Sequence, residues 1–146
     1  MGDIEHERVL VFDPGESTGW VFGIDDYLAA GGTIGRDHEK VAQMILELEP
    51  DIVVVERFNL YPGKAKSLSW NSFYPVEVIG VIKYICMVHG VTLVEQAPSI
   101  KKYAGGFGAD WDEFKLRNKS ALKVTEHVKD AYQHWKYYLK FNKKER

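Results

Sequence analysis

The chain has 146 residues, of which 45% are hydrophobic and 27% charged, which predicts one folded domain over residues 1–146 and excludes a disordered chain. The net charge of -2 combines 3 Lys/Arg against 11 Asp/Glu in residues 1–50 with 16 against 10 in residues 51–146. The second part can therefore bind phosphate, although lysines that only solvate helices give the same balance. One cysteine, Cys86, excludes an internal disulfide and disfavours a thiolate zinc site. With no apolar run of membrane-spanning length and an acidic N-terminus, we expect a cytoplasmic protein without membrane contact.

The first part of the chain predicts three short strands joined by tight turns, which together form an antiparallel meander. Their expected ranges are 8–13, 19–24 and 27–34. A helix follows, because apolar residues recur there at the spacing of one helix face: Val41, Met44, Ile45 and Leu48. Pro50 closes this helix.

The second part alternates strands with helices. Ile52 to Val55 is an apolar run without alternation, which is typical of a central strand buried on both faces. Beyond it we expect a helix with Pro75 in its first turn, a strand, a loop-rich stretch and a final helix. Their expected ranges are 70–89, 91–95, 96–118 and 119–140.

Two of the predicted core strands end in an acidic residue. Asp13 follows the apolar run Val9 to Phe12 directly, and Pro14-Gly15 then turns the chain away. Glu56 ends the strand that begins at Ile52. A carboxylate at the end of a buried strand needs a partner, and a divalent cation is a good candidate. The alternative is that Asp13 only ends its strand and caps the turn.

The final helix carries a third acidic residue. His127, Asp130 and His134 stand at i, i+3 and i+7, on one face beside the apolar stripe. This boundary lets side chains reach the edge of a sheet while the helix stays anchored. A solvated polar face has the same pattern, and the role of His134 stays open, with a place on the rim as one alternative.

Taken together, these motifs give the chain a resemblance to a known family. The matching segments are Asp13-Pro-Gly with Thr18-Gly19-Trp20, Val55-Glu56 with Phe58, and His127-Val-Lys-Asp130-Ala131. From about residue 8 to 139, the chain resembles the RuvC family of Holliday junction resolvases, and within it the phage-type members. That family has the RNase H-like α/β fold, a mixed five-stranded sheet with helices in the order βββαβαβα.

The resemblance implies a divalent-metal-dependent endonuclease with two Mg²⁺ ions in each active site. Asp13 would bridge the ions, Glu56 and Asp130 would flank them, and His127 would occupy the fourth ligand position. Because imidazole suits softer ions than carboxylate does, Mn²⁺ is a plausible replacement. Two such ions supply what phosphodiester hydrolysis needs: an activated water and neutralisation of the developing charge.

The resemblance also implies branched DNA as substrate and a homodimer, since a four-way junction has two symmetric strands to cut. The apolar helix over residues 70–89 is the candidate dimer interface. Basic residues would hold phosphate and aromatic residues would stack on unpaired bases. The candidate DNA-binding residues are Arg57, Phe58, Tyr61, Lys64, Lys66, Lys101, Lys102 and Lys119. The acids Asp110, Asp112 and Glu113 leave the extent of the basic surface open.

Three other functions remain open on the same residues. One is an RNase H-like or YqgF-like nuclease that acts on RNA or RNA–DNA hybrids. Another is a catalytically silent nucleic-acid-binding module, although carboxylates facing phosphate would not help such a module to bind. The third is one half of a sugar-kinase-type ATPase, for which the chain lacks a second domain and an obvious second phosphate loop.

Overall fold

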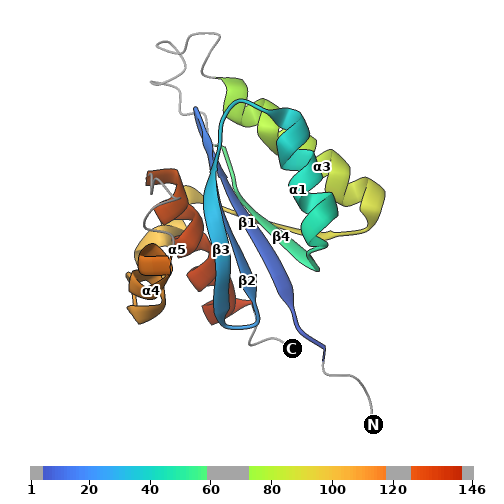
Figure 1. Ribbon diagram of the computed structural model, residues 1–146. Helices are drawn as coiled ribbons and strands as arrows, with labels where there is room; N and C mark the ends of the chain where they lie inside the picture. Colours follow the sequence, from blue (N-terminus) through green and yellow to red (C-terminus); the bar gives the residue numbers. More distant parts are fainter. Residues whose placement is uncertain (1–4, 59–72, 118–125, 143–146) are drawn as a thin grey trace.

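The computed structural model describes residues 5–58, 73–117 and 126–142, which form one five-stranded sheet with helices on both faces (Figure 1). The strand order is β3-β2-β1-β4-β5. The strands are β1 (Arg8–Pro14), β2 (Thr18–Ile24), β3 (Tyr27–Ile34), β4 (Ile52–Glu56) and β5 (Thr92–Gln96). β1, β2 and β3 pair antiparallel, whereas β4 pairs parallel with both β1 and β5. The mixed sheet expected from the sequence is therefore confirmed.

The helices form a layer on each face of the sheet. Their bounds are α1 (His38–Leu48), α3 (Tyr74–His89), the 3₁₀ helix η2 (Pro98–Tyr103), α4 (Ala109–Arg117) and α5 (Glu126–Phe141). Figure 1 shows α1 and α3 together on one side of the sheet and α4 and α5 on the other. The order of the predicted elements, βββαβαβα, is thus present, with η2 and α4 added before the last helix.

The alternation of side chains along β1 explains the two layers. Val9 and Val11 point to the core under α4 and α5, whereas Leu10 and Phe12 point to the core under α1 and α3. All four are buried, as the unbroken apolar run predicted. The acidic residue that follows, Asp13, has the parity of Val9 and Val11 and therefore faces α5.

The stretch 96–118 was predicted as loop-rich, and this prediction is wrong for most of its length. It contains η2 and α4. Charged residues dominate α4, so its apolar face consists of little more than Trp111 and Phe114, both buried. The ring of Phe114 packs where Gly31 in β3 leaves room, since a Cβ at that glycine would lie 2.8 Å from the ring. The packing against the sheet, which no local pattern shows, makes this segment a helix.

The remaining bounds agree with the predictions to within a few residues. α3 has Pro75 in its first turn and ends at Gly90, whose φ of 68° is left-handed. The predicted starts of the helices over 70–89 and 119–140 lie outside the described residues. Among the helices that the structure describes, none is long and apolar enough to cross a membrane.

Candidate active site

Three carboxylates converge where β1 and β4 end. Asp13, Glu56 and Asp130 each offer an oxygen, and these atoms all lie within 4.8 Å of one another. Asp13 is buried, and the other two are partly exposed. The sequence predicted all three as metal ligands, and the fold brings them together from elements far apart in the chain.

The register of the sheet explains why the first two acids meet. β1 and β4 run parallel, with Phe12 opposite Val55, so the next residues, Asp13 and Glu56, leave the sheet side by side. Their side chains point to the face covered by α5, because each has the parity of the strand residues that pack there. Asp130, in the first turns of α5, supplies the third carboxylate from the helix that covers this face.

His127 joins the cluster through Asp13. Its Nδ1 lies 2.9 Å from Oδ2 of the aspartate, which accepts a hydrogen bond from the imidazole. This contact requires α5 to approach the sheet closely, and two glycines permit it. A Cβ at Gly19 would lie 2.2 Å from the backbone carbon of His127, and a Cβ at Gly15 would lie 2.1 Å from its ring. The glycines of the first motif therefore serve the site and not only the turn.

A cation from the chain itself already lies among the acids. The Nζ of Lys101, on η2, is 3.3 Å from Oε2 of Glu56 and 3.1 Å from Oδ2 of Asp130. Three carboxylates and one imidazole are a donor set that suits Mg²⁺ or Mn²⁺. The space that takes up an ammonium group between two carboxylates shows that positive charge fits there. The residues present therefore fit a divalent metal.

The protonation of the acids is uneven. Burial raises the pKa of Asp13 to about 7, helped by the charges of Glu56 and Asp130 and opposed by the hydrogen bond from His127. Burial also raises the pKa of Glu56, but hydrogen bonds from His134 and Asp13 and the charge of Lys101 outweigh it and lower this pKa to about 2. The hydrogen bond to Asp13 raises the pKa of His127 above its usual 6.5. Without a metal, Asp13 thus keeps its proton to a higher pH than an exposed aspartate does, whereas Glu56 ionises at a lower pH than an exposed glutamate does.

His134 is the residue whose role the sequence left open. It is not on the rim but fully buried on α5, and its ring contacts the last residues of β4 and β5. Its Nε2 lies 2.7 Å from Oε2 of Glu56 and its Nδ1 lies 2.8 Å from Oε1 of Gln96. The i+7 spacing from His127 was visible in the sequence, but Gln96 carried no signal, because its role depends on where β5 ends.

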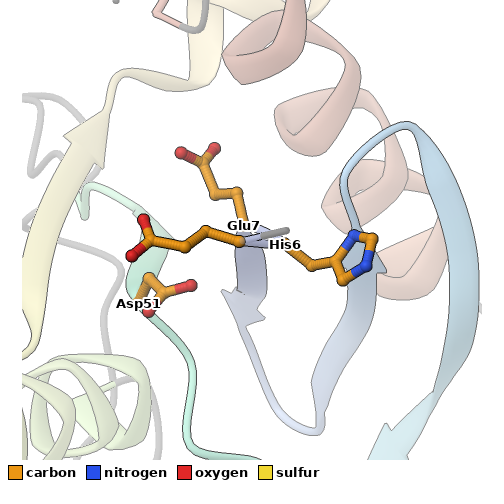
Figure 2. Close-up of a pocket in the computed structure, with 4 residues that line it drawn as sticks. His6, Glu7 and Asp51 are labelled. Atoms are coloured by element: carbon orange, nitrogen blue, oxygen red, sulfur yellow. The ribbon is translucent and has the colours of Figure 1, made fainter. Parts of the chain in front are cut away.

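A second acidic group lies at the opposite end of the sheet and differs in character. Glu5, His6, Glu7 and Asp51 surround a pocket where β1 and β4 begin (Figure 2). Their polar groups already serve the fold: Asp51 accepts from the backbone N–H of Arg8, and Glu7 accepts from the hydroxyl of Tyr138. The cluster around Asp13 is therefore the candidate active site.

The comparisons with known proteins identify the fold. Thermus thermophilus RuvC, solved in complex with a Holliday junction substrate, matches with a TM-score of 0.68 and 18% identity over 96% of this chain and 97% of that one. The chain has the RuvC fold. The yeast mitochondrial Holliday junction resolvase Ydc2 matches with a TM-score of 0.57 and 11% identity over 91% of this chain and 78% of that one. The fowlpox virus Holliday junction resolvase matches with a TM-score of 0.53 and 13% identity over 95% of this chain and 99% of that one. No family model and no curated protein sequence matches.

On this RuvC-like fold, the predicted DNA-binding residues have different surroundings. Arg57 is exposed beside Glu56, and Lys102 is exposed with its Nζ 5.2 Å from the ring centre of Tyr103. Phe58 is half-buried and packs against the core under α1 and α3. Lys101 lies inside the acidic cluster, not on an open surface. The other four predicted contacts lie outside the described residues: Tyr61, Lys64, Lys66 and Lys119.

Proposed function

We propose that this protein is a divalent-metal-dependent DNA endonuclease that resolves four-way junctions by paired, symmetric nicks. The observation that carries the proposal is the meeting of Asp13, Glu56 and Asp130 at the end of two parallel strands. Its support comes from the fold, which is that of resolvases, one of them solved with a Holliday junction substrate. Acids so close together repel one another unless positive charge lies between them, and a phosphodiesterase needs such charge.

The roles follow from the positions of the four residues. Asp13 is central and buried, so we assign it the bridging position, with Glu56 and Asp130 on either side. His127 lies against Asp13 and would supply a nitrogen ligand. Bound Mg²⁺ or Mn²⁺ would supply the activated water and the positive charge that phosphodiester hydrolysis needs. The positions of these four residues set where the hydrolysis takes place. The product would have a 5′-phosphate and a 3′-hydroxyl.

Lys101 has a position that suits a second task in this reaction. In the metal-free protein its ammonium group neutralises Glu56 and Asp130. When metal takes over that neutralisation, the flexible side chain is free to turn toward the backbone of the DNA beside the cut. Arg57 and Lys102 extend the basic edge. We assign to Phe58, half-buried two residues beyond Glu56, a contact with the bases at the centre of a junction.

The function is tested with the full chain and Mg²⁺ or Mn²⁺ on four substrates: a four-way junction, a flap, a linear duplex and an RNA–DNA hybrid. We expect symmetric paired nicks on the junction, with 5′-phosphate ends, and no cleavage in excess EDTA. If the protein cleaves the RNA–DNA hybrid and leaves the four-way junction uncut, the RNase H-like alternative replaces the proposal. Junction binding without cleavage in either metal would favour the silent binding module.

A second active site for the opposite strand calls for a dimer, and α3 has a surface that suits one. Gly80 and four apolar residues share an arc of its exposed face: Val76, Tyr84, Met87 and Val88. A glycine within an apolar stripe costs helix stability but allows another helix to come close. We propose that this stripe packs against its copy on a second chain, as the apolar composition of the predicted helix suggested.

Met87→Glu should convert the dimer to a monomer, because it places a charge on the apolar stripe that the dimer would desolvate. Multi-angle light scattering of the wild type should give twice the chain mass of 16.7 kDa, and the variant should give the single mass. Leu116→Glu is the matched control, since Leu116 is 72% exposed on α4 against 73% for Met87. If Leu116→Glu dissociates the dimer and Met87→Glu does not, the interface lies on the other layer.

A further inference from the structure

We propose that His134 is a positioning residue for the metal site: its buried imidazole, braced by Gln96, holds one oxygen of Glu56 so that the other faces the metal. The inference rests on the metal site of the proposed function. It concerns a buried residue of α5 whose two ring nitrogens contact Glu56 and Gln96.

The first step is that His134 contacts a single oxygen of Glu56. The Nε2–H of its ring donates to Oε2 over 2.7 Å. Lys101 approaches the same oxygen, at 3.3 Å. Oε1 is therefore the oxygen of Glu56 that neither His134 nor Lys101 contacts, and it is the one that we assign to the metal. A carboxylate that rotates freely presents either oxygen. Metal binding would then have to order the side chain, and the lost conformational entropy would lower the affinity for the metal.

The second step is that the ring of His134 cannot rotate. It is 0% exposed, on the buried side of α5 between Ala131 and Trp135, which are also 0% exposed. The Nδ1 meets the side-chain amide of Gln96 at 2.8 Å. The atom of the amide that meets Nδ1 is Oε1, which accepts from the ring, so each ring nitrogen faces an oxygen acceptor. The imidazole is thus fixed at both nitrogens.

The third step is that Gln96 is itself fixed by the sheet. It is the last residue of β5, buried, and lies opposite Glu56 in the parallel pairing of β4 and β5. Its carbonyl oxygen accepts from the backbone N–H of Arg57 over 2.7 Å. Glu56, His134 and Gln96 therefore form a closed arrangement that joins the ends of two strands to α5. Residues that hold a metal ligand in this way set its geometry, and replacing one typically lowers metal affinity by about 10- to 100-fold.

The surroundings argue against a purely structural role for the histidine. A buried imidazole that only filled space would be replaceable by an apolar residue and would not need to meet two polar groups from different strands. Here both polar contacts depend on the ends of β4 and β5, the same ends that place the candidate ligands.

The test measures Mn²⁺ binding to the DNA-free protein by the electron paramagnetic resonance signal of unbound Mn²⁺. His134→Leu should weaken binding by about 10- to 100-fold. His134→Gln keeps an N–H donor near the position of Nε2 and should stay within about threefold of the wild type by the same reasoning. Tyr138→Phe is the control for a lost buried hydrogen bond on α5, because its hydroxyl donates to Glu7 at the far end of the sheet. It should leave Mn²⁺ affinity unchanged.

A double variant separates positioning from general destabilisation. Gln96→Leu alone should weaken Mn²⁺ binding, and adding it to His134→Leu should weaken binding no further, because Gln96 acts through the imidazole. If His134→Leu does not fold, Gln96→Leu and His134→Gln carry the comparison. Unchanged affinity in His134→Leu or Gln96→Leu, or an equal loss in Tyr138→Phe, would overturn the inference. A wild type that binds no Mn²⁺ would instead overturn the proposed function.

Discussion

Asp13→Asn should abolish metal-dependent cleavage while leaving the fold and junction binding intact. The asparagine side chain has nearly the shape of aspartate but cannot ionise, so the acidic cluster loses one of the negative charges that would bind a metal. A correctly held metal contributes several kcal/mol to the transition state, so we expect the rate to fall by at least about 10³-fold. Single-turnover cleavage of a labelled junction measures the loss, and a gel shift in Ca²⁺ measures binding.

The matched control for this variant is Asp112→Asn. Asp112 lies on α4 outside the cluster, with its side chain 73% exposed. Its loss of charge should change the cleavage rate by less than about twofold, as is usual for exposed surface substitutions. An Asp13→Asn protein that cuts at the rate of the wild type would show that the three carboxylates do not hold the catalytic metal.

The same substitution should remove a pH dependence of stability. The folded protein holds a proton on Asp13 up to a pKa of about 7, whereas the unfolded chain releases it near the usual 3.8. The free energy of unfolding of the metal-free wild type should therefore fall as the pH rises through that window. Asparagine cannot ionise, so the variant should be more stable than the wild type at pH 8 and little different from it at pH 4. Urea unfolding in EDTA at both pH values measures this, and added Mg²⁺ should stabilise the wild type alone.

Gly19→Ala should damage both the fold and the reaction, because α5 crosses β2 at this glycine. A Cβ there would lie 2.4 Å from the carbonyl oxygen of His127 and equally close to the backbone nitrogen of Val128. Both contacts are with backbone, so the helix itself must move. We expect the free energy of unfolding to fall by about 1 to 3 kcal/mol, the usual cost of an overpacked contact.

The effect of Gly19→Ala on activity should exceed its effect on folding. His127 lies at the point of contact, and Asp130 follows one turn later on the same helix. A displacement of about 1 Å in a positioned group costs about 100-fold in rate, so cleavage should fall by that order even in protein that is fully folded. Thermal unfolding and single-turnover cleavage at a temperature well below the transition measure the two effects.

Gly35→Ala provides the comparison, since a Cβ at that position would meet nothing within 4 Å. It should be as stable and as active as the wild type. If Gly19→Ala cleaves normally, then close contact between α5 and β2 is not needed to place His127 and Asp130, and their assignment as ligands loses its geometric basis.

Much of the fold follows from local patterns in the chain. The apolar runs that end at Asp13 and Glu56 contain the information for two central strands, because a strand buried on both faces needs apolar residues at every position. Parallel pairing then brings the two acids to one edge. The amphipathic spacing of α5 likewise placed His127 and Asp130 on the face toward the sheet. The acidic cluster was thus predictable from these three segments.

Other features depended on contacts that no local pattern records. α4 buries two aromatic residues, Trp111 and Phe114, on an otherwise mostly charged helix. The ring of Phe114 packs against the sheet because Gly31 has no side chain in its way. The ion pair that Lys101, on η2, forms with Asp130 is another such contact, and the prediction that Lys101 binds DNA stays a prediction. In both cases the deciding partner is distant in sequence, so composition and periodicity could not report it.

The sequence by itself determined that two core strands deliver carboxylates to one edge of the sheet and that a third acid follows on the last helix. The tertiary structure alone decided how those carboxylates are held. Gly15 and Gly19 let α5 close onto β2, and His134 with Gln96 fixes Glu56. The physical reason is that burial and hydrogen-bond partners depend on where a helix crosses a sheet, whereas strand and helix formation depends mainly on neighbours along the chain.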